Sequence, residues 1–381
     1  MKIVINRDQL MNSIQDVMKA ISSKPTIQVL SGMKIEATNE EVKLTGSDSD
    51  ITIESIIPKE EDGIVHIHDV TPGKIVVQAK FLPDIIKKLP DDTVEIESDD
   101  DLNILIRSGQ AEFKLNGQDP EEYPQLPLLE TENSFHIQID LLKTLIRQTN
   151  FAVSTSETRP VLTGVHFKLE NNQLELVATD SHRLASRQIA MDEDTSQIEF
   201  KNIVIPGKSL GELNKILDES QESIQISVSD NQILFRTKHL FFLSRLLDGN
   251  YPETSRLIPD QSKTEVQVNA KDLMQTIDRA SLLAKDNRNN IVKLMTQDQH
   301  KIEISSNSPE IGTAEEVLQT NSISGEDLKI SFNAKYMIDA LRAIDADEVK
   351  ISFTGAMRPF IIEPIDDAEH ILQLITPVRT Y

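Results

Sequence analysis

The sequence predicts an α+β fold made of three copies of one unit, each with two helices and several antiparallel strands. A chain of 381 residues is too long for one ordinary core, which indicates two or three domains. Two helical patterns recur along the chain, once in each half of every unit. Between them lie short runs that alternate apolar and polar residues, such as 94–97, 224–228 and 349–353, which are typical of strands with one solvated face.

The first helix of the unit is found by shifting the sequence by 132 residues against itself. The matched pairs are Ile5 and Ile137, Asp8 and Asp140, Leu10 and Leu142, Ile14 and Ile146, and Ala20 and Ala152. The same shift places Gly32 on Gly164, Asp48-Ser49 on Asp180-Ser181, and Asp140 on Asp272. Chance does not explain so many matches at one offset.

The second helix carries a base, an acid and a base in every copy. The positions are Lys80, Asp84 and Lys87; Lys208, Glu212 and Lys215; and Lys335, Asp339 and Arg342. Offsets of 0, 4 and 7 place the three charges on one helix face, opposite the apolar residues. A single stripe of this kind is usually a solvated face. Its triplication favours a shared function.

The charge of the chain is unevenly distributed. The formal net charge of −23 argues against a nucleic-acid partner, because such proteins usually present a basic surface. The six predicted helices nevertheless sum to +6, which leaves −29 on the rest of the chain. If these helices share one surface, we expect them to form a mildly positive wall that holds phosphates without sequence preference, while the acidic exterior repels DNA.

Composition excludes several other classes of protein. Hydrophobic residues form 38% of the chain, aromatic residues only 4%, and Trp is absent, so the cores are predicted to be aliphatic. The lack of Cys excludes disulfides, thiolate metal sites and a cysteine nucleophile, and suits a reducing cytosol. Neither a signal peptide nor a run of 18 apolar residues is visible, so we expect no membrane association.

Linkers are predicted where Pro and acidic residues concentrate, near 116–134 and 246–263. The two stretches resemble each other, since both contain a Tyr-Pro pair, at Tyr123 and at Tyr251. The expected domains are therefore an N-terminal domain over 1–129, a central domain over 130–254 and a C-terminal domain over 255–381.

Several motifs resemble a known family. They are Ala-Thr-Asp-Ser-His-Arg-Leu-Ala at 178–185, Asp-Gly-Asn-Tyr-Pro at 248–252, Phe-Asn-Ala-Lys-Tyr at 332–336 and Pro-Val-Arg at 377–379. Over essentially its whole length the chain resembles the bacterial sliding clamps, the beta subunits of DNA polymerase III. The resemblance implies a DNA clamp fold and a head-to-tail homodimer that closes as a ring around double-stranded DNA in the cytoplasm, associated with the nucleoid. It also implies partners, namely the replicative polymerase catalytic subunit, the clamp loader and other proteins with clamp-binding motifs.

The family binds its partners in a groove between the second and third domains. By position, the groove residues of this sequence are Leu162, Thr179, Ser181, His182, Arg183, Leu184, Pro252, Arg256, Leu257, Asn333, Tyr336, Met357, Pro359, Leu374, Ile375, Thr376, Pro377, Val378 and Arg379. The family often has Gly at the position of Ser181 and a larger apolar residue at that of Thr376, and this tail continues to Thr380 and Tyr381. These departures bear on peptide preference.

The resemblance also implies a ring interface and a set of DNA contacts. Phe113 and Leu115 of one subunit would pair with Leu282 and Leu283 of the other, although ordinary core positions are an equal alternative for these four residues. The DNA-facing residues would be Lys24, Lys80, Lys87, Arg159, Lys208, Lys215, Lys335 and Arg342. Lys24 and Arg159 each precede a proline in matching loops.

Four patterns suggest chemistry that we do not expect. Residues 204–209 run from a strand through Gly-Lys-Ser into a helix, but Asn202 stands where a phosphate-binding loop has its first glycine. His66 and His68 alternate on a predicted strand without a third metal ligand nearby, which favours surface histidines. In the predicted extended segment 180–182, the Asp, Ser and His side chains point apart.

The remaining pattern concerns acidic runs, at Asp48, Asp50 and 99–101, which are the residue types that hold magnesium in nucleases and polymerases. Their position in loops is better explained by solvation. Three classes of protein remain: a non-enzymatic ring clamp with no cofactor or metal, a magnesium-dependent enzyme acting on nucleic acid, and a general interaction scaffold. Triplication favours the clamp, because a ring needs equivalent units whereas an active site needs one unique cluster.

Overall fold

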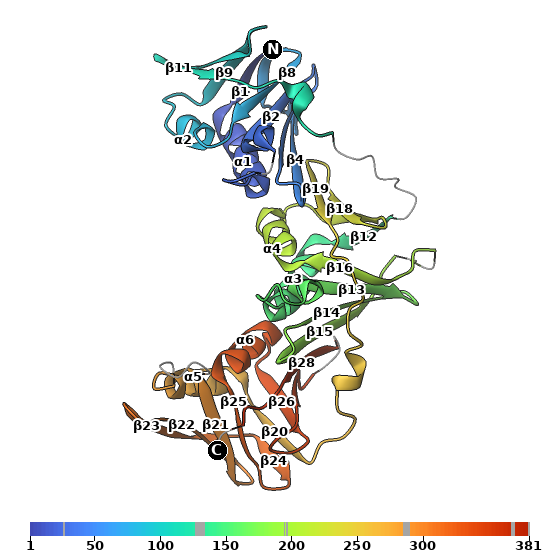
Figure 1. The fold of residues 1–381 in the computed structure, drawn as a ribbon, viewed down its shortest axis with the longest axis vertical. Coiled ribbons are helices and arrows are strands. Elements are labelled where there is room, and N and C mark those ends of the chain that lie inside the picture. The colour runs from blue at the N-terminus through green and yellow to red at the C-terminus, as the bar shows by residue number, and fades with distance from the viewer. Residues whose placement is uncertain are drawn as a thin grey trace. The chain divides into compact units, whose positions relative to one another are not determined.

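The computed structural model describes residues 1–25, 27–125, 134–193, 195, 197–284, 290–366 and 370–379. The chain forms two compact units (Figure 1). Residues 1–140 and 212–246 form what we call the first unit, and residues 141–211 and 247–381 form the second unit. The middle sequence repeat is therefore divided, since its strands join a sheet in each unit.

The described residues contain six α-helices, two for each sequence repeat, as the repeat pattern predicts. They are α1 (Arg7–Val17), α2 (Leu82–Lys87), α3 (Ile139–Thr149), α4 (Gly207–Ile216), α5 (Ala270–Ser281) and α6 (Ala334–Ile344). Their helical spacing of apolar residues buries one face, for example Leu10, Ile14 and Val17 of α1. One expected position was wrong: Lys80 precedes the short α2 and does not belong to it.

Asparagine side chains cap three of these helices at their N-termini. The Oδ1 atom of Asn6 accepts from the backbone N–H of Asp8 at 3.0 Å, and that of Asn269 accepts from Asp272 at 3.0 Å. Asn333 caps α6 in the same way, through the N–H of Lys335 at 2.9 Å. A capped N–H is one that the helix cannot satisfy internally, so each residue sets where its helix begins.

The first unit contains two main antiparallel sheets. In the order of their hydrogen bonding, the five-stranded sheet consists of β11 (Ala111–Asn116), β10 (Asn103–Ser108), β9 (Thr93–Ser98), β1 (Lys2–Asn6) and β7 (Ile67–Thr71). The eight-stranded sheet consists of β12 (Ser134–Gln138), β17 (Ser223–Val228), β18 (Gln232–Arg236), β19 (Leu240–Arg245), β4 (Ile51–Pro58), β3 (Glu41–Ser47), β2 (Gly32–Ala37) and β8 (Gly73–Gln78). A small hairpin pairs β5 (Glu60–Glu61) with β6 (Ile64–Val65).

The second unit also contains two antiparallel sheets. The nine-stranded sheet consists of β16 (Phe200–Pro206), β13 (Gly164–Glu170), β14 (Gln173–Thr179), β15 (Arg183–Ala190), β28 (Ile371–Ile375), β27 (Phe360–Pro364), β26 (Glu348–Phe353), β20 (Thr264–Asn269) and β24 (Ser322–Gly325). The four-stranded sheet consists of β23 (Gly312–Gln319), β22 (Lys301–Ser308), β21 (Ile291–Asp298) and β25 (Lys329–Asn333).

In each unit the long sheet joins strands from two sequence repeats, and it does so in the same register. Ser55 of β4 lies opposite Leu240 of β19 in the first unit. Arg187 of β15 lies opposite Ile371 of β28 in the second unit. Residues 55 and 187 are equivalent at the repeat spacing of 132. The next N–H along each strand, of Ile56 and of Gln188, donates to a histidine carbonyl, of His239 and of His370, so the two junctions share one backbone frame.

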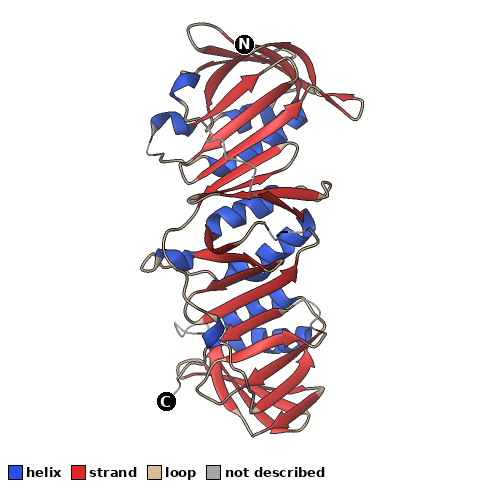
Figure 2. Cartoon of the chain, turned by 90° about the vertical axis from the view of Figure 1, so that its right-hand side faces the viewer, coloured by secondary structure: helices blue, strands red, loops and turns tan. Residues whose placement is uncertain are grey.

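Helices pack on the sheets (Figure 2). The prediction of purely aliphatic cores was wrong, because most of the few aromatic residues are apolar phenylalanines and several of them, such as Phe242 and Phe332, are fully buried. In the first unit α1 packs against β3 and β4, and in the second unit α5 and α6 pack against each other. Leu273, Ile277, Met337 and Leu341 form one continuous cluster with strand residues such as Phe332. Among the described residues, no helix is long and apolar enough to cross a membrane.

Candidate functional site

The predicted groove residues lie in the second unit, around the pairing of β15 with β28. Leu184 is the register partner of Leu374, and both belong to a buried apolar cluster together with Leu162. Leu257 and Met357 remain exposed. Buried aliphatic side chains thus come together from two strands and from the short 3-10 helix Pro160–Thr163. Leu257 and Met357 are large apolar side chains at the surface of the same unit.

The C-terminal segment is held in this region by backbone hydrogen bonds. The carbonyl of His182 accepts from the N–H of Thr376 at 2.9 Å and from its hydroxyl at 2.8 Å. The N–H of Val378 donates to the carbonyl of Ser331 at 2.7 Å. Residues 376–378 therefore extend from the end of β28 along described parts of the second unit, while Thr380 and Tyr381 lie outside the described residues.

Arg183 does not project freely into solvent. Its guanidinium donates to Asp180 at 3.1 Å, to Asp339 at 2.9 Å and to the carbonyl of Phe151 at 2.7 Å. The guanidinium carbon also lies 4.6 Å from the ring centroid of Tyr336, where the negative ring face attracts a cation. The side chains of Arg183 and Asp339 are only 11% and 15% exposed, so this ion pair is well shielded from water.

The network corrects our expectation for the charged stripe of α6. Asp339 was expected to face solvent beside Lys335, but its carboxylate accepts from both Arg183 and Lys335, the latter at 2.6 Å. Glu212 of α4 instead bonds only within its own stripe among the described contacts, to Lys215 at 2.9 Å. The three stripes are alike in sequence, yet one of them is tied to the β14–β15 turn.

The repeated Asp-Ser pair is a structural turn. The Oδ1 of Asp180 accepts from the N–H groups of His182 and Arg183, and Ser181 has a left-handed backbone with φ of 76°. Asp48 accepts from two backbone N–H groups in the same way, beside Ser49 at φ 79°. Glycine adopts this conformation without strain, which explains why it suits the position of Ser181. The expectation that residues 180–182 are extended was wrong, because they form this turn. The Asp180 carboxylate accepts hydrogen bonds from Arg183 and takes part in no catalytic relay with Ser181 and His182 among the described contacts.

Two other suspected sites also have structural explanations. A Cβ added to Gly207 would lie 2.8 Å from Oδ1 of Asn150 and 3.0 Å from the carbonyl of Thr163, so close packing requires this glycine. The carboxylate of Asp99 accepts from the side chain and the backbone N–H of Asn103, and these bonds lower its pKa. Within the described ranges no three His, Asp or Glu side chains gather as a metal site.

The histidine pair departs from its expectation in a different way. His68 is exposed on β7, as expected for a surface histidine. His66 lies just before β7 and is only 8% exposed. Predicting both as surface residues was therefore wrong for His66, because the chain turns this side chain inward between the β5–β6 hairpin and β7.

The sequence reading missed Tyr251, which is central to the apolar cluster under Leu184 and Leu374. Its hydroxyl accepts from the N–H of Thr179 at 3.0 Å, and burial raises the pKa of the phenol. His166 stacks on its ring with centroids 5.0 Å apart, and burial lowers the pKa of that imidazole. The signal was present in the sequence, because a Tyr-Pro pair occurs at 123 as well as at 251. Tyr123 is likewise buried, against Leu30.

The predicted DNA-facing bases are all exposed. Four belong to the first unit (Lys24, Lys80, Lys87 and Lys215), and four to the second (Arg159, Lys208, Lys335 and Arg342). Lys208, Lys215, Lys335 and Arg342 lie on α4 and α6, whereas Lys24 and Arg159 lie in loops. Their charge is therefore available to a ligand from solvent, and Lys215 and Lys335 each share it with one acid on the same helix.

The four predicted interface residues are not ordinary core. Phe113 on β11 is 38% exposed, and Leu282, just after α5, is 60% exposed. Leu115 and Leu283 are half-buried. Phe113 and Leu115 belong to the first unit, and Leu282 and Leu283 to the second.

Comparison with known proteins gives matches over the whole chain. Family models described as the N-terminal, central and C-terminal domains of the DNA polymerase III beta subunit match residues 1–127, 136–253 and 255–379. The beta sliding clamp of Bacillus subtilis (strain 168) is 56% identical over 383 residues, and that of Staphylococcus epidermidis (strain ATCC 12228) is 48% identical over 381, with complete coverage of both chains in each case.

Solved structures agree with these sequence matches. The crystal structure of the DNA polymerase sliding clamp from Bacillus subtilis superposes with a TM-score of 0.96 at 55% identity. That of the DNA polymerase III beta chain from Streptococcus pneumoniae gives 0.95 at 39% identity. Both comparisons cover 100% of this chain and of the related chain.

Repeated helix pairs on antiparallel sheets, together with these matches, define the class as a DNA clamp. Within it the chain belongs to the DNA polymerase III beta subunit family, the beta sliding clamps. It is the processivity factor of that polymerase and a non-catalytic subunit of the holoenzyme.

We predict that Asp339→Ala lowers the free energy of unfolding by about 2 kcal/mol, because it removes a charged acceptor from the shielded Arg183 guanidinium. Urea denaturation followed by circular dichroism measures the change. Asp84→Ala is the matched control: Asp84 is the equivalent acid of α2 and is exposed, so its loss changes the value by less than about 0.5 kcal/mol. Equal effects of the two substitutions would contradict a special role for Asp339.

Proposed function

We propose that two copies of the chain close head to tail into a ring around duplex DNA and tether replication proteins to it. Each copy would contribute three domains, with boundaries near 129 and 254. The observation that carries the proposal is a pair of different open strand edges, one in each unit, with exposed apolar side chains beside both. The ring would work in the cytoplasm, associated with the nucleoid.

The two edges are β11 and β23. Strand β11 is the outer strand of the five-stranded sheet, and β23 is the outer strand of the four-stranded sheet. Open edges present unpaired N–H and C=O groups that readily pair with another chain. Phe113 projects from β11, and Leu282 follows α5, which packs against β23. Pairing β11 of one copy with β23 of the other would continue a sheet and bury these side chains.

Copies that join through two different surfaces form a closed ring only if the rotation from one copy to the next, repeated around the assembly, adds up to a full turn. With one β11 edge and one β23 edge per copy, two copies joined twice leave neither edge open. This arrangement satisfies the backbone groups of both edges and covers Phe113, Leu115, Leu282 and Leu283 together.

We predict that Leu282→Ala with Leu283→Ala shifts the protein from dimer to monomer, because each truncation removes about 2–5 kcal/mol of buried contact. Sedimentation velocity at nanomolar concentration measures the shift from about twice 42.8 kDa to 42.8 kDa. Ile64→Ala with Val65→Ala, at two exposed apolar positions of the β5–β6 hairpin, is the control and should stay dimeric. A fully dimeric Leu282/Leu283 variant would refute the interface.

The surface around Leu184 and Leu374 is proposed to receive a short peptide from the polymerase catalytic subunit, the clamp loader or another partner. Its support is the buried apolar cluster with Leu257 and Met357 exposed. Apolar anchors of such a peptide would pack on these side chains, which is a common mode of binding in preformed sites. Arg183 would act indirectly, since its bonds to Asp180 and Asp339 hold the turn that ends at Leu184.

We predict that removing residues 376–381 abolishes binding of a clamp-binding-motif peptide and leaves the dimer intact. The truncation deletes the Thr376 and Val378 segment, which is bonded to His182 and Ser331. Fluorescence anisotropy with a labelled peptide measures binding. Removing only residues 380–381 is the control, and it should bind normally. Unchanged binding by the longer truncation would mean that the peptide site is elsewhere.

DNA is proposed to be held by phosphate contacts of the exposed bases on α4 and α6, Lys80 and Lys87 around α2, and the loop bases Lys24 and Arg159. A stripe that recurs once per repeat meets a different phase of the DNA groove each time, so it cannot read bases and can contact only phosphates. Acids beside Lys215 and Lys335 weaken the attraction to any one phosphate, which would let the ring slide.

We predict that rings loaded on nicked circular DNA survive high salt and are released only when the circle is linearised. Direct binding to open linear DNA should be weak and fall steeply with salt, because it depends on phosphate contacts alone. Release from intact circles at high salt would contradict topological retention.

In the same assay, Lys80→Glu, Lys208→Glu and Lys335→Glu together should reduce the number of loaded rings. Lys201→Glu, Lys238→Glu and Lys263→Glu form a control with the same charge change at other exposed lysines. Equal losses in the two triple variants would mean that only net charge matters.

A further inference from the structure

The buried apolar cluster under Leu184 and Leu374 contains one aromatic side chain, Tyr251. Its other buried members are aliphatic: Leu162, Val177, Val204 and Ile361. The tyrosine is 9% exposed, and it directly precedes Pro252, which belongs to the expected peptide groove. The position of this one flat ring therefore helps to set the shape of the surface that the cluster offers to a peptide.

Hydrogen bonds fix both ends of Tyr251. Its N–H donates to Oδ1 of Asn202 at 3.2 Å, and the side-chain amide of the same asparagine donates to the carbonyl of Gly249 at 3.0 Å. At the tip of the ring, the hydroxyl accepts from the N–H of Thr179 at 3.0 Å. These bonds hold the backbone and the hydroxyl, but they do not restrain the rotation of the ring about its Cβ–Cγ bond, which is a soft torsion.

His166 supplies the missing restraint. Its imidazole lies nearly parallel to the ring of Tyr251, with an interplanar angle of 7° and centroids 5.0 Å apart, which is within the favoured range for stacked rings. The imidazole is itself held, because its Nε2 donates to the carbonyl of Lys201 at 3.0 Å. Burial lowers the pKa of this imidazole, so the ring is neutral near pH 7 and stacks without a charge to desolvate.

The stack divides the surroundings of the Tyr251 ring. The imidazole covers one face, so the other face and the edges of the ring provide its contacts with the apolar cluster. A ring that rotates about its long axis withdraws part of this face from the cluster and leaves room there. The imidazole thus keeps the cluster closed, and its removal would let a larger apolar group enter.

The equivalent tyrosine of the first unit has different surroundings. Tyr123, in the other Tyr-Pro pair, is buried in a smaller cluster with Val29, Leu30 and Val76. At the repeat spacing of 132, residue 34 is the equivalent of residue 166. Lys34 stands there, and it pairs with Glu36 at 2.9 Å. A lysine thus replaces the stacking imidazole.

The first unit also differs at the position of Leu184. Its equivalent is Thr52, whose hydroxyl lies 2.8 Å from that of Ser47. The aromatic stack therefore accompanies the apolar surface that is proposed to receive a peptide, and both are replaced by polar side chains in the first unit. Since the tyrosine is buried in both units, this difference connects the histidine to the peptide surface more closely than to the fold.

We propose that His166 is a positioning residue that determines anchor specificity in the peptide site: its stack on Tyr251 keeps the apolar cluster closed, so that an aliphatic anchor is favoured over an aromatic one. The inference rests on the proposed peptide site around Leu184 and Leu374. His166 would act only through Tyr251 and would not touch the peptide.

The test compares the affinities of the full-length protein for a labelled clamp-binding-motif peptide and for versions in which each aliphatic anchor in turn is changed to phenylalanine. Fluorescence anisotropy gives each Kd, and the readout is the ratio of the phenylalanine Kd to the aliphatic Kd. For the anchor that meets Tyr251, this ratio should be about tenfold in the wild type, because a closed apolar pocket discriminates by size to that extent.

Two substitutions separate the ring of His166 from its hydrogen bond. His166→Gln keeps a donor for the carbonyl of Lys201 and removes the ring, so the ratio should fall to about threefold or less. His166→Phe keeps a flat ring and removes the donor, so the wild-type ratio should persist. If the hydrogen bond were the important feature, the two variants would behave in the opposite order.

Rotation of the Tyr251 ring gives a second readout, which does not depend on the peptide. The chain has only four tyrosines, so ring-labelled tyrosine gives a simple NMR spectrum. Relaxation dispersion should show faster rotation in His166→Gln than in the wild type, and wild-type rotation in His166→Phe. Thermal unfolding checks that each variant is folded, and His166→Ala, which also has no ring, takes the place of His166→Gln if that variant is not.

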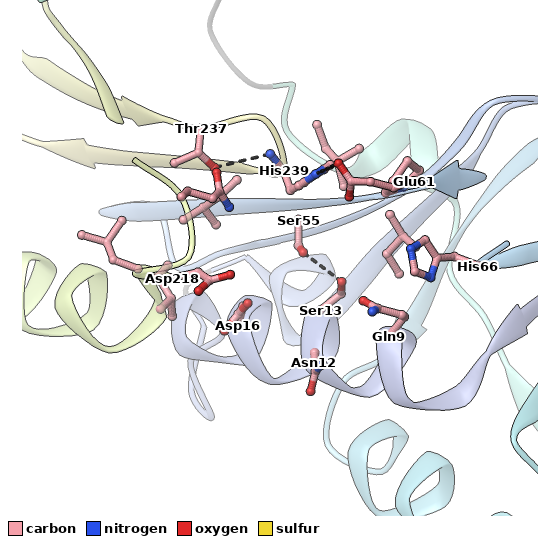
Figure 3. A pocket seen from close by; sticks show the side chains of 17 residues that line it. Gln9, Asn12, Ser13, Asp16, Ser55, Glu61, His66, Asp218, Thr237 and His239 are labelled. Atoms are coloured by element: carbon pink, nitrogen blue, oxygen red, sulfur yellow. Dashed lines mark hydrogen bonds and ion pairs between the residues drawn. The ribbon is translucent and has the colours of Figure 1, made fainter. Parts of the chain in front are cut away.

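His66→Ala is the control for the loss of a buried histidine. His66 belongs to the first unit, is 8% exposed and lines a polar cavity of about 300 Å³ (Figure 3). Because this cavity is formed by residues of the first unit, the substitution should leave both the peptide affinity and the anchor ratio unchanged.

The outcomes separate the two proposals. Failure of the wild type to bind the unmodified peptide would contradict the peptide site itself. If the wild type binds, an unchanged anchor ratio and unchanged ring rotation in His166→Gln would overturn the role of His166 alone. An equal fall of the ratio in His166→Phe, or in His66→Ala, would also overturn it, because neither change removes a ring from Tyr251.

Discussion

The antiparallel pairing of strands from different sequence repeats is the constraint on which the other features depend. β4 pairs with β19, and β15 pairs with β28, at equivalent register. Side chains in a sheet alternate between its faces, so a slip of one residue would send every inward residue outward. This register places Leu184 opposite Leu374 and brings the carbonyl of His182 to Thr376. It also divides the middle repeat between two compact units.

Within that frame, equivalent residues have acquired different roles. Asp84, Glu212 and Asp339 occupy the same place in the repeated charge pattern. Only Asp339 bonds a shielded arginine among the described contacts, and it connects α6 to the turn before Leu184. Breaking a shielded charge pair leaves the remaining charge poorly solvated, which is why such pairs tie elements together more firmly than exposed ones do. The proposed DNA surface and the proposed peptide surface thus share one carboxylate.

The sequence by itself determined the repeat, the helix pairs, the strand alternation and the membership of the family. These features are local or periodic, and they are written in the spacing of apolar residues and in motifs such as 178–185. The importance of Tyr251 was also readable, because its Tyr-Pro pair repeats. The periodicity of the sequence does not reveal which hydrogen-bond or ion-pair partner each polar side chain has.

Only the tertiary structure decided that Asp339 meets Arg183, that His66 turns inward and that Lys80 precedes its helix. Residues 183 and 339 are far apart in the chain, and a hydrogen bond between them depends on how separate elements pack. The composition of a segment does not reveal which distant residues its side chains will contact. A pattern of alternating charges defines a helix face, but the surface that this face meets is defined by the whole fold.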